Sequence, residues 1–287
     1  MKLVRFGEPG RERPGVWLDL PGGPAILDVR GTAFDIADYD AHFFSHHGLA
    51  RAAALTREHK RKLIPAGSVR LGPPVARPGK IICVGKNYAD HAKEFDAVVP
   101  SSPVLFSKAT TSLSGPFDPI VIRPDAASTD SEVELAVVIG TVTRGVDEAR
   151  ALEAIAGCAV LNDVTDRHAQ KEGGQWFRGK SFDTFCPMGP WLVTRDAFDP
   201  AAPAALRSRL NGQLFQQGRT SDMMFGIARL ISFISQSITL EPGDVLATGT
   251  PAGVGFARNP PVLLKPGDTI ECEIDGLGAI RNTVTTR

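Results

Sequence analysis

Short apolar runs, more than long helical patterns, dominate this chain. Residues 131–140 read Ser-Glu-Val-Glu-Leu-Ala-Val-Val-Ile-Gly, which opens with alternation, continues as a β-branched apolar run and closes on glycine. This pattern is typical of a strand. The apolar runs at 81–85 and 158–162 predict two further strands. With 29 Gly and 22 Pro in the chain, the pattern indicates a strand-rich fold with many turns.

Two segments carry a helical pattern within the larger part of the chain. Asp147 is placed to cap a short helix that runs through Ala156 and ends at Gly157. A longer helix is predicted to begin near residues 220–222. One of its faces carries five apolar residues, for which a role in the core is sufficient: Met224, Ile227, Ile231, Ile234 and Ile238.

The N-terminal part of the chain differs in pattern from the rest. Residues 1–72 are predicted to form a small α+β domain, residues 73–80 a proline-rich linker, and residues 81–287 the larger domain. Within the small domain the expected elements are strands near 2–6, 15–18 and 26–28, followed by a helix-compatible, alanine-rich stretch from 38 to 62.

Charge and cysteine usage narrow the classes of function. The 32 basic and 32 acidic residues give a formal net charge of zero, which argues against nucleic acid or an anionic membrane surface as a partner. No apolar run reaches membrane-spanning length, and no signal-peptide core follows the first residues. The four cysteines are scattered and form no C-x-x-C pair, as expected for reduced, buried thiols. We therefore expect a cytoplasmic protein.

Three acidic residues at strand positions are candidate metal ligands. Glu132 and Glu134 must point to the same side of their strand because strand side chains repeat every second residue. Asp163 ends another predicted strand. Oxygen donors without nearby Cys or His suit a hard cation such as Mg²⁺ or Mn²⁺. The spacing alone, however, favours a second interpretation, in which the two glutamates line the solvated face of an edge strand.

His91, Glu94 and Lys180 are candidate catalytic residues. His91 and Glu94 are three positions apart on a predicted helix, so their side chains can pair, and a carboxylate on one imidazole nitrogen raises the basicity of the other. That arrangement suits a general base for water, but an exposed surface pair fits the spacing equally well. Lys180 lies among turn-forming and apolar residues, where it could stabilise an oxyanion or extend to solvent as a surface side chain.

Several short runs, taken in order, resemble the fumarylacetoacetate hydrolase family and together cover residues 80–287. They are Gly-Lys-Asn-Tyr-Ala-Asp-His at 85–91, Ser-Pro-Val-Leu-Phe at 102–106, the acidic strand at 132–140, Asn-Asp-Val-Thr at 162–165, Gly-Lys-Ser-Phe-Asp at 179–183 and Gly-Thr-Pro at 249–251. Each run is short, but the joint match is specific, and it decides between the two interpretations of the acidic strand in favour of a metal site.

The resemblance implies a role for each matching position. Glu132, Glu134 and Asp163 match ligands of Mg²⁺ or Mn²⁺. His91 and Glu94 match a water-activating dyad, Lys180 a residue that stabilises the transition state, and Gln170 one that positions the water or the substrate. The remaining matches are substrate-binding positions: Tyr88, Lys108 and Thr250. The dyad would lie on a segment, 87–100, that orders as a lid; its apolar residues are Phe95, Val98 and Val99.

The implied fold is mainly β with some α: a mixed β-sandwich roll, plus the small N-terminal domain, in a homodimer or higher homo-oligomer. The N-terminal extension and the run 174–185 are most like bacterial hydrolases of 2,4-diketo-3-deoxy sugar acids, those derived from rhamnonate or fuconate. Lys86 and His168 depart from the residues usual in the family, which bears on which substrate fits.

The expected activity is metal-dependent hydrolysis of the C3–C4 bond of a 2,4-diketo acid, such as 2,4-diketo-3-deoxyrhamnonate, to pyruvate and a hydroxy acid. Two alternatives use the same site: decarboxylation of oxaloacetate, and hydration or isomerisation of a 2-oxo-alkenoate. A third is a non-catalytic member that only binds a ligand. The dyad favours hydrolysis because hydrolysis requires an activated water. The sequence leaves the acyl group beyond C4 open.

Overall fold

The computed structural model describes residues 1–94, 100–125 and 128–286. The described strands form a large mixed sheet, a smaller sheet and one short pair. The large sheet has the order β4-β3-β2-β1-β14-β12-β11-β17-β6-β7, with β5 beside β1 and β8 beside β14. Its strands are β1 (Lys2–Phe6), β2 (Arg13–Leu20), β3 (Gly23–Asp28), β4 (Leu63–Pro65), β5 (Leu71–Gly72), β6 (Ile81–Gly85), β7 (Val104–Lys108), β8 (Leu113–Ser114), β11 (Val133–Ile139), β12 (Ile155–Asn162), β14 (Cys186–Thr194) and β17 (Val245–Ala247).

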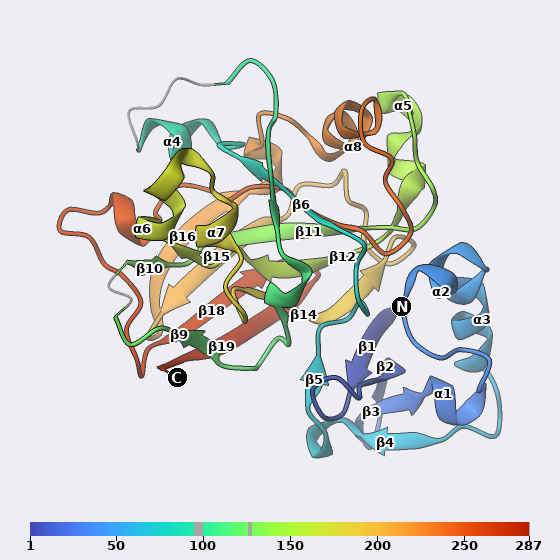
Figure 1. Ribbon diagram of the computed structural model, residues 1–287. Helices are drawn as coiled ribbons and strands as arrows, with labels where there is room; N and C mark the ends of the chain where they lie inside the picture. Colours follow the sequence, from blue (N-terminus) through green and yellow to red (C-terminus); the bar gives the residue numbers. More distant parts are fainter. Residues whose placement is uncertain (95–99, 126–127, 287) are drawn as a thin grey trace.

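The smaller sheet has the order β16-β15-β18-β19-β9, and β10 pairs with β13. The strands are β9 (Ile120–Ile122), β10 (Thr129–Asp130), β13 (Thr165–Asp166), β15 (Ala205–Leu210), β16 (Gln213–Arg219), β18 (Thr269–Ile274) and β19 (Gly278–Thr286). Figure 1 shows the C-terminal strands β18 and β19 in red, lying away from the N-terminal elements in blue. The expected mainly β fold with some α is confirmed.

The described helices are short and lie around the sheets. They are α1 (Val29–Thr32), α2 (Ala41–Ser45), α3 (Gly48–Leu55), α4 (Ala89–Lys93), α5 (Glu148–Ala151), α6 (Arg167–Lys171), α7 (Phe177–Lys180) and α8 (Ile227–Ser235). The 3₁₀ turns are η1 (Ala66–Ser68), η2 (Thr110–Ser112), η3 (Leu152–Ala154), η4 (Glu172–Gly174), η5 (Thr220–Asp222) and η6 (Gly255–Ala257). Over the described ranges, none of these helices has the length and apolar character needed to cross a membrane.

Successive side chains of strand β11 point alternately into two different hydrophobic clusters. Val133, Leu135, Val137 and Ile139 pack in the cluster that also holds apolar residues of β15, β18, β19 and α8. The intervening Ala136 and Val138 belong to a second cluster on the opposite face. Because side chains alternate between the faces of a strand, Glu132 and Glu134 have the same parity as this second set. The two acidic side chains therefore point away from the space between the sheets.

The N-terminal strands continue the large sheet. Strand β1 pairs with β14 in the register Lys2↔Val193 and Leu3↔Leu192. Leu3 is fully buried, in the same hydrophobic cluster as Leu161 and Met188 of the larger unit. An ion pair from Arg70 Nη2 to Asp118 Oδ2, 2.5 Å long, also joins the two parts. The division into residues 1–72, 73–80 and 81–287 stays a prediction, although this packing couples the two parts.

The two helix predictions for the larger unit were wrong in their bounds. The turn after Asp147 ends at Ala154, not Ala156, because Ile155 opens the buried strand β12 between β11 and β14. Helix α8 begins at Ile227, not near 220, because the preceding residues contact another segment: Met223 bridges Tyr88, and Met224 N donates to Asn87 O. The expectation that all four cysteines are reduced and buried is confirmed.

Replacing Leu3 with Ala tests how far the two parts of the chain fold together. The truncation leaves a cavity in a cluster that both parts share, and a loss of roughly 2–5 kcal/mol in unfolding free energy is expected. Denaturant unfolding followed by circular dichroism and by tryptophan fluorescence should show one coincident transition at lower denaturant. Val142→Ala, at a 67% exposed position, is the control and should change stability by less than about 0.5 kcal/mol. Two separated transitions would instead support an independently folding N-terminal domain.

Candidate active site

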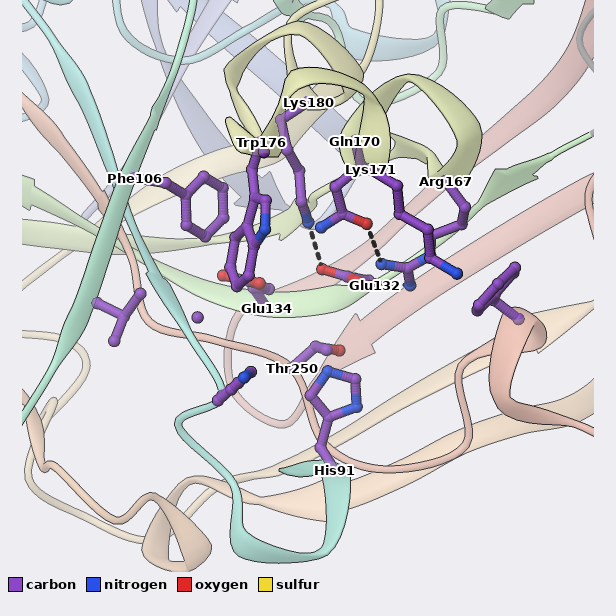
Figure 2. A pocket seen from close by; sticks show the side chains of 15 residues that line it. His91, Phe106, Glu132, Glu134, Arg167, Gln170, Lys171, Trp176, Lys180 and Thr250 are labelled. Carbon is purple, nitrogen blue, oxygen red and sulfur yellow. Dashed lines mark hydrogen bonds and ion pairs between the residues drawn. The ribbon is translucent and has the colours of Figure 1, made fainter. Parts of the chain in front are cut away.

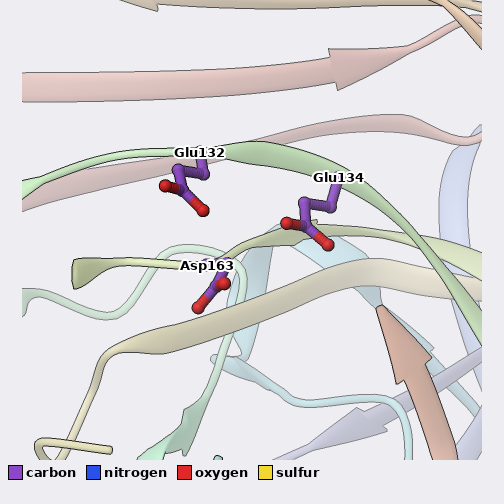
Figure 3. A group of neighbouring side chains, drawn as sticks. All are labelled: Glu132, Glu134 and Asp163. Carbon is purple, nitrogen blue, oxygen red and sulfur yellow. The ribbon is translucent and has the colours of Figure 1, made fainter. Parts of the chain in front are cut away.

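Three buried carboxylates meet where β11 and β12 lie side by side. The register places Val133 opposite Asn162 and Glu134 opposite Leu161, so Glu132 and Asp163 stand next to each other at the end of the strand pair. The backbone N–H of Asp163 donates to the carbonyl oxygen of Glu132 at 2.9 Å. One oxygen from each of Glu132, Glu134 and Asp163 lies within 4.8 Å of the others. Figure 3 shows the three side chains next to one another. Strand geometry therefore brings together the three residues that the sequence singled out.

Three cationic side chains surround these carboxylates. Lys180 Nζ donates to Glu132 Oε2 at 2.7 Å and to Asp163 Oδ2 at 2.5 Å. Lys108 Nζ donates to Asp163 Oδ1 at 2.6 Å, and Arg167 Nη2 lies 2.6 Å from Glu132 Oε1. All of these side chains are buried. Lysine and arginine are rarely buried unless paired, and the carboxylates supply the partners.

The electrostatic balance differs between the two glutamates. Burial opposes ionisation of Glu132, but Lys180 and Arg167 outweigh it and hold the pKa of Glu132 well below its usual range. Burial raises the pKa of Glu134 well above its usual range, and the negative charges of Asp163 and Glu132 raise it further. Although burial opposes the charge on Lys180, the charges of Asp163 and Glu132 raise its pKa. For Glu134, unlike Glu132, the nearby positive charge of Lys180 does not outweigh burial and the neighbouring carboxylates.

A divalent metal ion fits this donor set. The three side chains offer hard oxygen donors at mutual distances suited to one ion, with no thiolate or imidazole among them. The side chain of Glu134 accepts a hydrogen bond from the backbone N–H of Gly249 at 2.8 Å, whereas the three buried cationic side chains pair with Glu132 and Asp163 instead. A cation beside Glu134 would relieve the repulsion that raises its pKa. Mg²⁺ or Mn²⁺ is consistent with these donors.

A cavity of about 380 Å³ opens over the carboxylates. Figure 2 shows Glu132 and Glu134 at its base, Lys180, Gln170 and Arg167 on one side, and His91 facing them from the other. The described residues that line it are Val84, Gly85, Lys86, His91, Phe106, Glu132, Glu134, Arg167, Gln170, Lys171, Gly174, Trp176, Lys180, Thr250 and Phe256. The cavity is therefore charged at its base and largely aromatic on one wall.

His91, on helix α4, and Glu94, directly after the helix, form the expected pair. His91 Nδ1 lies 3.0 Å from Glu94 Oε2, and Glu94 Oε1 accepts a hydrogen bond from the backbone N–H of Gly253 at 2.7 Å. A carboxylate fixed on Nδ1 orients the imidazole and places the basic Nε2 away from Glu94. His91 is only 8% exposed, and it lines the cavity. The pair is thus positioned as a general base would need to be.

The glycine-containing loop after β17 closes the base of the cavity. Strand β17 lies between β11 and β6, which brings Gly249 level with Glu134. Gly249 has φ +98°, a left-handed conformation that favours glycine, and a Cβ there would lie 2.8 Å from Asn87 Cβ. Thr250 Oγ1 donates to the carbonyl oxygen of Val133 at 2.9 Å and accepts from Gln216 Nε2 at 2.8 Å. The loop is therefore fixed against the acidic strand.

The remaining predicted positions are distributed unevenly around the cavity. Gln170 lines it and accepts a hydrogen bond from Arg167 Nη1 at 3.2 Å. Lys108 pairs with Asp163, and Tyr88 is 3% exposed, with a hydroxyl that has no hydrogen-bond partner among the described residues. Among the described residues, neither contributes to the cavity lining. Their roles, and those of the other predicted site residues, stay predictions.

Of the two departures from the family pattern, Lys86 lines the cavity, whereas His168 is exposed and, within the described ranges, is not part of the lining. The apolar lid residues Phe95, Val98 and Val99 lie outside the described residues.

Three residues that line the cavity were not predicted from the sequence: Arg167, Phe106 and Trp176. Arg167 Nε and Nη2 both donate to Asp130 Oδ2, at 3.0 and 2.7 Å, so this arginine links the β10–β13 pair to Glu132. A signal was present, because Arg167 and Gln170 are three positions apart on one short helix that follows the predicted ligand Asp163. Phe106 and Trp176 stand within two of the runs that carry the resemblance, at 102–106 and 174–185, but nothing in those runs assigned either residue a role.

Comparisons with known proteins agree with this geometry. Residues 80–285 match the family model described as the fumarylacetoacetate (FAA) hydrolase C-terminal domain. A protein of Burkholderia ambifaria, named only as an inferred hydrolase, is 46% identical over 97% of this chain and 96% of its own. The structure of fumarylacetoacetate hydrolase from Exiguobacterium antarcticum is 42% identical, with a TM-score of 0.84 over 100% of both chains.

Two further solved structures resemble this chain and carry names for different reactions. A 2-hydroxyhepta-2,4-diene-1,7-dioate isomerase from Mycobacterium marinum is 35% identical, with a TM-score of 0.79 over 100% of this chain and 99% of its own. A maleylpyruvate hydrolase from Sphingobium sp. SYK-6 is 31% identical, with a TM-score of 0.81 over 100% of both chains. The domain match and these full-length similarities show that the chain belongs to the fumarylacetoacetate hydrolase family.

Proposed function

We propose that this protein hydrolyses the C3–C4 bond of a 2,4-diketo acid, with Mg²⁺ or Mn²⁺ as cofactor. The observation that carries the proposal is the His91–Glu94 pair, 3.0 Å apart and facing the acidic base of the cavity. Isomerisation or decarboxylation of a 2-oxo acid needs no attacking water, whereas hydrolysis does. The substrate we favour is a 2,4-diketo-3-deoxy sugar acid such as 2,4-diketo-3-deoxyrhamnonate, because of the likeness of the run 174–185 to the hydrolases of such acids.

The chain supplies each group that this reaction needs. Bound by Glu132, Glu134 and Asp163, a divalent ion would supply Lewis-acid stabilisation of negative charge on the 2-oxo acid. His91 would take a proton from water, and Glu94 would hold the imidazole in the orientation for that transfer. Lys180, whose pKa is raised, stays protonated and would stabilise the oxyanion at C4.

The proposed hydrolysis needs no reactant other than the diketo acid and water. The oxygen of water forms a bond to C4, and the C3–C4 bond breaks, leaving its electron pair on C3 as the enolate of pyruvate. Protonation of C3, with the proton that His91 accepted as one source, gives pyruvate. The carbons from C4 onward leave as a carboxylic acid, which is a hydroxy acid if the substrate derives from a deoxy sugar.

Isomerisation of a 2-oxo-alkenoate is the second candidate. It is favoured by the likeness to a structure named as a 2-hydroxyhepta-2,4-diene-1,7-dioate isomerase. The same cavity could hold such a substrate, since both reactions stabilise charge on a 2-oxo acid. An isomerase moves a proton between carbon atoms, so it would use His91 as an acid–base group without a bound water. A purely ligand-binding protein would have no need of the oriented His91–Glu94 pair.

Metal removal tests the cofactor. Activity on a 2,4-diketo acid should disappear after EDTA treatment and return with Mg²⁺ or Mn²⁺. Glu134→Gln should weaken Mn²⁺ binding, measured by calorimetry, by roughly 10- to 100-fold or more, since it removes one of three charged ligands. Glu153→Gln, at an exposed position, is the matched control and should bind Mn²⁺ normally. Full activity of the stripped protein would contradict the assignment.

Replacing His91 with Ala separates hydrolysis from the reactions that need no attacking water. Diketo-acid hydrolysis should fall by roughly 10²-fold or more, as for loss of a positioned base. Mn²⁺ affinity should be retained because His91 is not a proposed ligand, and oxaloacetate decarboxylation should fall much less. The exposed His59→Ala variant should resemble the unaltered protein. Unchanged hydrolysis with loss of decarboxylation would show that the protein is a decarboxylase.

A further inference from the structure

One wall of the cavity is aromatic and separates the cavity from a surface groove. The Phe106 and Trp176 rings meet at 66° with centroids 5.2 Å apart, and both line the cavity beside Val84. A surface groove of about 270 Å³ lies against the same two rings, lined also by Val104, Leu105, Ser107, Gly174, Gln175 and Phe177. Because Phe106, Gly174 and Trp176 belong to both linings, they form the partition between the two spaces.

The indole of Trp176 packs directly on the backbone of Gly85 in this partition. A Cβ at Gly85 would lie 2.5 Å from Trp176 Cζ3, which is closer than real Cβ contacts come, and 3.0 Å from Cη2. Gly85 is not among the positive-φ glycines, so its backbone does not itself require glycine. The ring of Trp176 therefore occupies the space that a side chain at position 85, the end of β6, would fill. A large side chain held this way has few alternative positions.

Helix α7 fixes the indole of Trp176 relative to Lys180. Trp176 precedes α7, and the backbone N–H of Lys180 donates to the carbonyl oxygen of Trp176 at 3.1 Å. Residues four apart on a helix share a face, and Lys180 Nζ lies 5.0 Å from the centroid of the Phe106 ring. Phe106, with Trp176 packed against it, therefore lines the cavity beside the ammonium group of Lys180.

We propose that Trp176 is a specificity-determining residue, whose indole ends the acyl subsite and restricts the substrate to short acyl groups with an apolar end. This inference rests on the proposed function, in which Lys180 stabilises the oxyanion at C4, and names the substrate class of that site. The cavity volume of about 380 Å³ lies near the lower end of the roughly 300–1,000 Å³ typical of small-molecule sites. A hydroxyethyl tail ending in a methyl group satisfies this limit.

The test is a series of acylpyruvates of increasing length, from acetylpyruvate to octanoylpyruvate, with Mg²⁺ present. For Trp176→Ala, the ratio of kcat/KM for octanoylpyruvate to kcat/KM for acetylpyruvate should rise tenfold or more, on the scale of roughly 10- to 200-fold for a changed apolar contact. The gain should come mainly from a lower KM for the long substrate, because removal of the indole joins the cavity to the groove. An unchanged ratio would overturn the proposal.

Phe177→Ala is the matched control. This neighbouring aromatic residue is 50% exposed and lines only the outer groove among the cavities described here. Its removal should leave both kcat/KM values and their ratio unchanged while the partition is intact. If Phe177→Ala raised the ratio as much as Trp176→Ala does, the effect would belong to the surface groove, and the role of Trp176 would be refuted.

A double-mutant cycle tests the contact between Gly85 and the indole of Trp176. Gly85→Ala alone should displace the ring and change the length preference at least severalfold. In the Trp176→Ala background the same substitution should have no effect on that preference, because the atoms that it would meet are absent. Additive effects of the two substitutions would contradict the contact on which the proposal depends.

Binding without turnover separates this inference from the proposed function. Calorimetry with Mg²⁺ and 2-oxo acids from pyruvate to 2-oxooctanoate should show affinity that falls with length in the unaltered protein and does not fall in Trp176→Ala. If acylpyruvates are not hydrolysed but this difference is seen, the proposed reaction fails and the size limit stands. The same length dependence in both proteins, or no binding by either, would refute the size limit.

Discussion

The structure depends on one balance of charge, between the buried carboxylates at the ends of β11 and β12 and the cationic side chains around them. Lys108, Lys180 and Arg167 pair with Glu132 and Asp163, while Glu134 is left with backbone support from Gly249. Isolated buried charges are costly, and removing one partner of such a pair leaves the other uncompensated. The segments that carry the cations, β7, α6 and α7, are therefore tied to the acidic strand pair by electrostatics as well as by packing.

This balance also leaves a place for a cation among the three carboxylates. Glu132 is ionised by its cationic neighbours, whereas burial and like charges hold the pKa of Glu134 high. A divalent ion would meet one carboxylate that is already charged and another whose charge it would stabilise. Lys180 pairs with two of the proposed ligands, so the residue proposed to hold the oxyanion is fixed by the same acidic group.

The aromatic partition and the His91–Glu94 pair are positioned by different parts of the fold. Lys180 is the last residue of helix α7, and its backbone N–H donates to the carbonyl oxygen of Trp176, which precedes the helix. This contact fixes the aromatic wall relative to Lys180. His91 approaches from α4, and Glu94 is held by the loop after β17. Because β17 lies between β11 and β6, a single stretch of sheet aligns the acidic strand, the loop and the start of the segment that carries His91.

The sequence by itself determined the strand character of residues 133–139, the common side of Glu132 and Glu134, and the pairing of His91 with Glu94, since these follow from local periodicity. Together with the resemblance it indicated the fold and the donor set. Only the tertiary structure decided that Arg167 contacts Glu132, that Trp176 rests on Gly85, and that β12 begins at Ile155 instead of extending a helix. These outcomes depend on segments far apart in the chain, and no local pattern encodes which of them meet.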